Sequence, residues 1–208
     1  MNKPNKIYLF TIGFFLFFNS FGQNLKLKNN DAGLISLGGR TTISLFNDTQ
    51  SNSSGSGLGG QFRIQFADRI NSDWFFDYLT SDIENLANRT DYHIGWSVLV
   101  YPVPKMKIMK PYIIAGHCFD YSYLAENINP SNKIERWSSA VQGGLGTHFN
   151  LSPRLDCSLT GQYMIHLGNH IHSEISGNTV IFTSEKGASL EGHLLITLSL
   201  NYKLIDLW

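Results

Sequence analysis

Four side chains that can bind a metal ion or exchange a proton lie close together in the stretch HLGNHIHSEISGN. His166, His170, His172 and Glu174 are separated by even numbers of residues, so in an extended chain they would project from one face. Of these, His170 and His172 form a pair that could ligate Zn²⁺ or Cu²⁺. A glycine and an asparagine interrupt the pattern, however, and a polar loop with solvated histidines explains the same residues. We therefore expect a loop here and no metal site.

The remaining sequence contains no motif that implies a cofactor. Glycine loops for phosphate, CxxC pairs and long basic runs are all absent from it. Cys118 and Cys157 are the two cysteines, and the strand pattern described below sends them to opposite faces of non-adjacent strands. We expect two free thiols that pack as small apolar side chains.

The composition is unusual for a soluble protein. The 208 residues are enough for one domain, and the 16 basic and 16 acidic residues balance, so no charge bias points to nucleic acid. Charged residues make up only 15% and aromatic residues 13%, with 19 glycines, whereas an average soluble domain is about 25% charged. An apolar content of 42% excludes a bundle of transmembrane helices. These values indicate an all-β protein in unusual surroundings.

Residues 1–22, MNKPNKIYLFTIGFFLFFNSFG, have the layout of a secretory signal peptide. Lys3 and Lys6 form a positive segment, an apolar run follows at 7–18, and small residues precede an expected cleavage after Gly22. The apolar run is shorter than the roughly 20 residues that a membrane-spanning helix needs. We expect residues 1–22 to be removed after export, and residues 23–208 to form one domain.

Beyond the signal, apolar and polar residues alternate along eight segments separated by clusters of Gly, Pro, Asn, Asp and Ser. A period of two predicts strands, because successive side chains of a strand point to opposite faces. In the last segment Leu194, Ile196 and Leu198 share one face and Thr197 lies on the other, where Leu195 is the one apolar exception. The expected strands are 33–46, 58–67, 74–79, 90–101, 112–123, 136–150, 154–167 and 188–204.

Such alternation occurs both in soluble barrels, with the apolar face inside, and in membrane barrels, where the faces are inverted. Several strands exceed the five or six residues usual in soluble proteins and reach the about 9–11 that cross a bilayer when tilted. The polar face is rich in Gly, Ser, Thr and Gln, and Tyr and Trp lie near the ends of the apolar stripes, as in an interfacial girdle. We therefore predict an all-β fold, an eight-stranded antiparallel up-and-down transmembrane β-barrel.

A narrow barrel interior must pair the charges that it contains, because an isolated buried charge is costly. Charged residues of the polar face are candidates for such pairs. The interior polar network that we expect consists of Arg40, Arg63, Asp77, Asp156 and Glu191.

The end of the chain carries apolar residues at alternate positions and a terminal aromatic residue. The residues of this pattern are Leu198, Leu200, Tyr202, Leu204 and Trp208, and Asp206 does not match it. The pattern resembles the C-terminal signal of outer-membrane β-barrel proteins, which the barrel-assembly machinery reads. By strand count, length and chain end, residues 23–208 resemble the small eight-stranded outer-membrane barrel family of Gram-negative bacteria. The resemblance implies a monomer in the outer membrane, in contact with its lipid and lipopolysaccharide.

One pair on the lipid-facing stripe suggests chemistry. His117 lies near Ser139 on the neighbouring strand, and this pair resembles the Ser and His that outer-membrane lipid A deacylases use on their outer wall, together with an acidic residue. The H-x-S motif of those enzymes is absent, and no acidic residue is in phase. A shifted register of the strand explains His117 without catalysis, so we expect no enzyme.

The function that we expect is that of a non-enzymatic integral outer-membrane barrel. Side chains fill the interior of an eight-stranded barrel, which leaves structural, adhesive or binding roles for the outer loops. The alternatives are a lipid-modifying hydrolase of the deacylase type and a soluble periplasmic lipocalin-like binder. With an even strand count both termini are periplasmic, and the longer connections near 47–57, 82–89, 124–135 and 168–187 face outward.

Overall fold

The computed structural model describes residues 32–46, 54–104, 106, 108–177, 179–185 and 192–207. The expected signal peptide at 1–22, and Glu191 and Trp208, lie outside these residues. No helix in the described part of the chain is long and apolar enough to cross a membrane. The described strands are β1 (Leu34–Phe46), β2 (Ser54–Ala67), β3 (Ile70–Ile83), β4 (Ala87–Val100), β5 (Met109–Glu126), β6 (Lys133–Asn150), β7 (Leu155–His166), β8 (His170–Ser176), β9 (Thr179–Glu185) and β10 (Gly192–Asp206).

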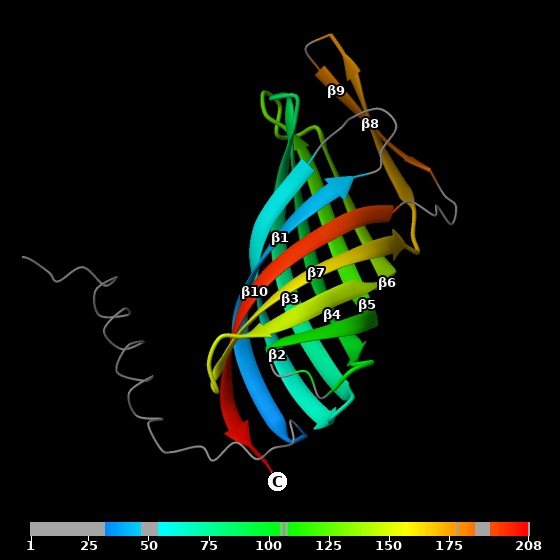
Figure 1. Cartoon of the computed structure of the whole chain (residues 1–208). Helices are drawn as coiled ribbons and strands as arrows, with labels where there is room; N and C mark the ends of the chain where they lie inside the picture. Colours follow the sequence, from blue (N-terminus) through cyan, green and yellow to red (C-terminus); the bar gives the residue numbers. More distant parts are fainter. Residues whose placement is uncertain are drawn as a thin grey trace, which may run out of the picture.

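Eight of these strands form a closed barrel in the order β1-β10-β7-β6-β5-β4-β3-β2 (Figure 1). Neighbouring strands of the barrel pair antiparallel, and β1 closes the sheet against β10 with Ile43 opposite Ile196. The β8–β9 hairpin is a separate two-stranded sheet inserted between β7 and β10. The predicted fold class, an all-β eight-stranded up-and-down barrel, is confirmed.

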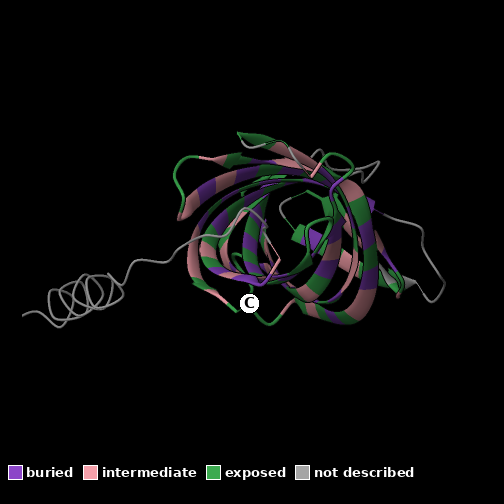
Figure 2. Ribbon diagram, turned by 60° about the horizontal axis from the view of Figure 1, so that its bottom comes forward, coloured by how far each residue is buried: buried purple, intermediate pink, exposed green. Residues whose placement is uncertain are grey.

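The apolar face of the barrel points outward. Leu58 is 71% exposed and Leu145 66%, whereas Arg63 and Asp120 on the alternate face are buried inside. Figure 2 shows this alternation as bands of buried and exposed residues along each strand. An apolar exterior around a polar interior is the inverted arrangement of membrane barrels, and it contradicts the lipocalin-like alternative, in which the apolar face would line the interior.

Strands extend into all four segments that the sequence predicted as outer loops, and β2 already begins at Ser54, within the predicted loop 47–57. β3 runs to Ile83 and β4 begins at Ala87, so the connection at 82–89 shrinks to a tight turn. Glu84 and Asn85 adopt positive φ angles of 51° and 60° in this turn, a conformation that asparagine tolerates better than most residues. β5 extends to Glu126 and β6 starts at Lys133, and the segment 168–187 contains the β8–β9 hairpin.

These longer strands have a packing reason. Ile83, Ala87 and Leu124 on the inner face of the extended wall are buried against Ile171 and Val180 of the hairpin. Asn132 Nδ2 also donates to the Val180 carbonyl at 2.7 Å. The β3–β4 and β5–β6 hairpins rise above the rest of the rim beside β8–β9 (Figure 1). We call the described residues of 80–90, 122–136 and 170–185 the outer platform, and the opposite end, where β1 begins and β10 ends, the terminal end.

A β-bulge changes the facing of the residues at the end of β10. Lys203 pairs with Ser36 and Ile205 with Ile35, so the register shifts between these two pairs. Leu198 and Leu200 are exposed on the outer wall, and Tyr202 is half-buried. After the bulge, Ile205 is exposed and Leu204 is half-buried, because one extra residue inverts the alternation. This shift explains why Asp206 does not fit a strict period of two.

Charged substitutions should distinguish the two faces. Leu159 and Leu198 are cross-strand partners on the outer wall, so Leu159→Arg or Leu198→Arg places a guanidinium in lipid. We expect a loss of about 2–4 kcal/mol in the free energy of unfolding, measured by urea titration in lipid vesicles. Asn129→Arg, at the exposed tip of the β5–β6 connection, is the matched control and should change little. Equal stability of all three variants would contradict the assignment of the outer wall to lipid.

Candidate functional site

Arg40 forms an ion-pair layer across the middle of the barrel. Its Nε lies 3.0 Å from Asp77 Oδ1 and its Nη1 lies 4.0 Å from Asp73 Oδ2, with all three side chains buried. The guanidinium also lies over the Phe75 ring, 4.5 Å from its centroid. Two predicted members of the interior network, Arg40 and Asp77, are therefore brought together.

Arg63 forms a second layer nearer the terminal end. Its Nη2 donates to Asp156 Oδ1 at 2.6 Å, and its Nη1 lies 3.0 Å from the ring nitrogens of His148. Asn201 Nδ2 donates to the same Asp156 oxygen at 3.1 Å, and the Tyr101 hydroxyl lies 2.9 Å from His148 Nε2. Arg63 and Asp156 thus meet as a second pair of the expected network.

Asp120 gathers a third layer toward the platform end. Arg136 Nη2 donates to its Oδ2 at 2.9 Å, and His166 Nδ1 lies 3.0 Å from that oxygen. His93 Nε2 lies 3.3 Å from the other oxygen, and His166 contacts His193 through their Nε2 atoms. These side chains come from β4, β5, β6, β7 and β10, so the layer ties together more than half of the barrel wall.

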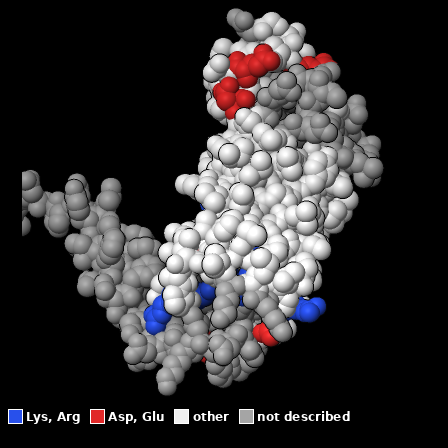
Figure 3. Space-filling model, viewed as in Figure 1, with Lys and Arg blue, Asp and Glu red and all other residues white. Residues whose placement is uncertain are grey.

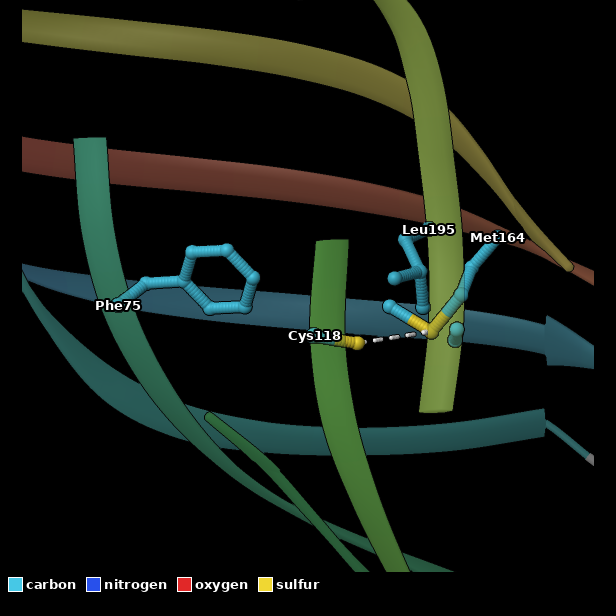
Figure 4. Packing of buried hydrophobic residues seen from close by; sticks show 5 residues of the cluster. Phe75, Cys118, Met164 and Leu195 are labelled. Carbon is cyan, nitrogen blue, oxygen red and sulfur yellow. Dashed lines mark hydrogen bonds between the residues drawn. The ribbon is translucent and has the colours of Figure 1, made fainter. Parts of the chain in front are cut away.

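An apolar group completes the filling of the interior. Phe75, Cys118, Ala140, Met164 and Leu195 form a buried cluster (Figure 4). The Cys118 thiol points to Met164 Sδ at 3.8 Å. Leu195, the apolar exception on the polar face of the last strand, is thereby accounted for as part of this plug. Cys118 and Cys157 are free, one buried and the other half-buried, as the sequence predicted.

The layers and the plug leave little open space inside. The cavity at the terminal end has a volume of about 30 Å³, and a second one beside Arg40 has about 10 Å³. A cavity needs roughly 10–15 Å³ to hold one water molecule. Within the described residues, the interior is therefore a packed core rather than a channel.

A row of aromatic side chains lies on the outer wall where the wall approaches the platform. Tyr78, Tyr92, Tyr121 and Trp137 are successive cross-strand partners on β3 to β6. Their rings are spaced at 5.2, 6.0 and 4.6 Å. The next outward-facing row toward the platform includes Thr80, Thr90 and Glu135. Tyr and Trp occupy such positions where a membrane meets water.

His117 and Ser139 are hydrogen-bonded on the outer wall, with His117 Nε2 3.1 Å from Ser139 Oγ. His117 does point outward. It pairs with Trp96 of β4 and with Val141 of β6, and neither strand pair has a register shift. The explanation by a shifted register was therefore wrong. Asp120, three residues further along β5, lies in the interior and therefore does not supply the acidic member of a hydrolase triad to this pair.

The histidine stretch does not form a metal centre in the described structure. His166 lies inside the barrel, while His172 and Glu174 are on the β8–β9 hairpin and are half-buried and exposed; the position of the His170 side chain is outside the description. Among the described residues, no three His, Cys, Asp or Glu side chains are arranged to hold a metal ion.

Charged side chains on the surface divide between the two ends. On the face shown in Figure 3, Lys and Arg lie at the terminal end together with a small acidic patch, Asp and Glu lie at the platform, and a mostly uncharged band separates the two ends. Exposed acids of the platform include Asp82, Glu84, Glu135 and Glu174. The band matches the height that lipid would cover.

No known protein-family model matches the sequence, and no curated protein matches it either. Solved structures do match the fold. OprG of Pseudomonas aeruginosa has a TM-score of 0.58 and 15% identity, covering 83% of this chain and 96% of that one. Neisserial surface protein A has a TM-score of 0.57 and 12% identity, and the match covers 81% of this chain and 96% of that one. A major outer membrane protein of Thermus thermophilus has a TM-score of 0.54 and 10% identity, and the match covers 81% of this chain and 98% of that one.

The chain has the fold of the small eight-stranded outer-membrane β-barrels. With its apolar outer wall and closed backbone, it has the architecture of an integral protein of the bacterial outer membrane. The expected resemblance to this group of barrels is thereby confirmed for the fold.

Sequence reasoning missed part of the interior network of this outer-membrane barrel. Asp73, Asp120 and Arg136 were not selected, although Asp120 follows the inward phase of Cys118 on the same strand. A rule that selects every charged or histidine residue on the inward phase would have found them. The strand limits used for the prediction placed Asp73 in a turn, so its phase was not considered.

Removal of Arg40 should test the central layer. Arg40→Met leaves the buried Asp77 and Asp73 carboxylates without their cation, which should cost about 3–5 kcal/mol in the free energy of unfolding. The double variant Arg40→Met/Asp77→Asn should recover part of this loss, because it removes a charge as well. Urea titrations in lipid vesicles would measure both.

The matched control is the surface pair of Lys133 and Glu135, 3.0 Å apart and far more exposed. Lys133→Met should leave the stability nearly unchanged, because solvent screens an exposed pair. If Arg40→Met and Lys133→Met had the same effect, the central layer would not stabilise the barrel.

Proposed function

We propose that this protein is a non-conducting, monomeric outer-membrane barrel that acts by binding through its outer platform, without enzymatic activity of its own. The observation that carries the proposal is the contrast between a filled interior and an ordered, extended platform. The described interior contains three charged layers and an apolar plug, and two of its cavities have volumes of about 30 and 10 Å³. Binding at the end of the barrel therefore suits this structure better than transport through it.

The platform is held by more than strand pairing. Asn88 Nδ2 donates to Asn127 Oδ1 at 2.6 Å, and Asn127 Nδ2 donates to the Asn85 carbonyl at 3.0 Å, which joins the two hairpin tips. Asn132 Nδ2 donates to Glu126 Oε2 at 2.8 Å. Because these side chains are already fixed, a partner that binds here loses less conformational entropy.

The surface of the platform also carries apolar side chains that packing does not require. Ile128 at the tip of the β5–β6 connection is 76% exposed, and Ile181 on β9 is 48% exposed. Both lie beyond the aromatic row, above the band that lipid covers. Exposed apolar residues on ordered tips, beside the acidic side chains of Figure 3, are typical of a binding surface.

The orientation of the barrel can be tested by labelling. We propose that the platform faces the cell exterior and the terminal end the periplasm, so Asn129→Cys should react with a membrane-impermeant maleimide on intact cells. Ser152→Cys, in the β6–β7 turn at the opposite end, should react only after the outer membrane is opened. Both variants use a Cys157→Ser background. Labelling of Ser152→Cys alone on intact cells would reverse the orientation.

The absence of conduction can be tested in planar bilayers. The refolded barrel should produce no stepwise openings above those of protein-free bilayers, because the Arg40 layer and the plug close its interior. Discrete channel openings that disappear with a bulkier residue in the plug, such as Ala140→Leu, would contradict the proposal.

The binding role can be tested by cell attachment. Cells that display the protein should adhere to glycan-coated or protein-coated surfaces more than cells that carry the empty vector. Ile128→Asn/Ile181→Asn should abolish the difference, whereas Ile108→Asn should not, because Ile108 is equally exposed but precedes β5 at the terminal end. Attachment that is equal for all variants and the empty vector would refute the role of the platform.

A further inference from the structure

Two buried histidines lie at the root of the β8–β9 hairpin, one on each strand that connects the hairpin to the barrel. His166 is the last residue of β7, and β8 begins at His170. On the return side, His193 is the second residue of β10 and pairs with Met164 of β7. The rings of His166 and His193 therefore meet where the hairpin leaves the barrel, with their centroids 4.4 Å apart and their Nε2 atoms in contact.

The contacts around this pair form one chain of hydrogen bonds when both rings are neutral. Ser44 Oγ lies 3.1 Å from His193 Nδ1, and His166 Nδ1 lies 3.0 Å from Asp120 Oδ2. A neutral imidazole has one N–H donor and one acceptor nitrogen. His166 therefore donates to Asp120 and accepts a hydrogen bond from His193 at Nε2. His193 in turn accepts from the Ser44 hydroxyl, so a single proton between the two rings completes the chain.

The charged groups around the pair are already matched. Those that face it are Arg89, Asp91 and His93 of β4, Asp120 of β5, Arg136 of β6 and, through His93, Asp77 of β3. Each carboxylate lies within 3.0 Å of an arginine, in the pairs Asp91–Arg89, Asp120–Arg136 and Asp77–Arg40. The two rings can share one added proton through their Nε2 atoms. A second proton would place two hydrogens and two uncompensated charges in the same buried contact, which is unfavourable.

A change at this root would reach the hairpin directly. Arg136 Nη1 donates to the Asn169 carbonyl at 3.3 Å, so the layer that contains the histidines also holds the segment that leads into β8. The hairpin is a separate sheet (Figure 1), and its Ile171 and Val180 pack on the inner face of the extended wall. A small unit with one such contact region can open locally while the barrel stays folded.

We propose that His166 and His193 form an acid-sensitive latch at the root of the β8–β9 hairpin, which is closed while the rings are neutral and is released when both are protonated. In the released state the rings contact water and titrate near the ordinary histidine pKa of about 6.5. The closed state disfavours the second proton, so the released state binds more protons and becomes more populated as the pH falls below that value. Each proton taken up on release raises the ratio of released to closed hairpin by up to about tenfold per pH unit.

Release would change the surface of the platform. It would uncover Ile83, Ala87 and Leu124, which the hairpin buries in the closed state. The proton needs no path through the filled interior, because the rings take it up as the root opens. The latch is thus a device of the fold itself and does not depend on whether the platform binds a partner.

The test is a measurement of the distance between the hairpin and the wall. Spin labels are attached to Thr183→Cys on β9 and to Asn129→Cys at the tip of the β5–β6 connection, both exposed positions. The background is Cys157→Ser, and Cys118 is buried. Electron paramagnetic resonance in lipid vesicles should give one short distance at pH 7.5 and a second, longer population at pH 5.0.

Variants of the latch should remove this response. His166→Gln and His193→Gln each keep a side-chain amide in the hydrogen-bonded chain but leave one ring, so the closed root never has to hold two charged rings. Each should lower the released population at pH 5.0 on the order of tenfold. His117→Gln, on the outer wall, is the matched control and should respond to acid as the original protein does.

Heat-modifiable migration on a gel checks that each variant has folded, and a variant that fails this check is replaced by asparagine at the same position. Acid release that is lost in the latch variants and kept in His117→Gln would support the proposal. An unchanged distance in the original protein at both pH values would overturn it. Acid release that persists in both latch variants would overturn it as well, because another group would then control the hairpin.

Discussion

Closure of β1 against β10 is the constraint on which the rest of this structure depends. In a bilayer no water is available to pair backbone N–H and C=O groups, so a sheet can cross only if it has no free edge. The pairing of β1 with both β2 and β10 removes the two edges at once. Closure at eight strands in turn fixes a narrow interior, and this decides what the inward-facing side chains can be.

The narrow interior explains the layered arrangement of charges. A buried charge is tolerated when a partner and further hydrogen bonds lie within reach. Arg40 meets Asp77, Arg63 meets Asp156, and Arg136 meets Asp120, and each pair joins two different strands of the wall. The apolar plug of Phe75, Met164 and Leu195 fills the space between the central layer and the Asp120 layer with side chains that need no partner. Together they fill much of the interior with side chains from the described strands.

The two ends of the barrel differ in structure. At the platform, long strands and a covering hairpin present exposed isoleucines and acidic side chains on an ordered surface. At the terminal end, a small cavity is lined by residues that include Arg63, Lys110, Asp156 and Lys203. The apolar outer wall between them is bounded at the platform end by the row from Tyr78 to Trp137.

The sequence by itself determined which side chains face lipid and which face the interior. The period of two is a local property of an extended chain, so residues such as Leu159 and Thr160 could be assigned to opposite faces without any partner strand. The choice of a membrane barrel followed from the length of the strands, the small polar residues of one face and the aromatic residues near the ends of the other. The inward position of Arg40, Arg63, Asp77 and Asp156 could be predicted for the same local reason.

Only the tertiary structure decided which of these residues meet. Register is set between strands, so the meeting of Asp120 with His93, Arg136 and His166 from three other strands could not be read along the chain. The bulge beside Ile35 shifts the end of β10, and the apolar contacts of Ile171 and Val180 with Ile83 and Leu124 turn expected loops into strands. These features depend on residues far apart in sequence that share one small volume, and a local pattern contains no information about such contacts.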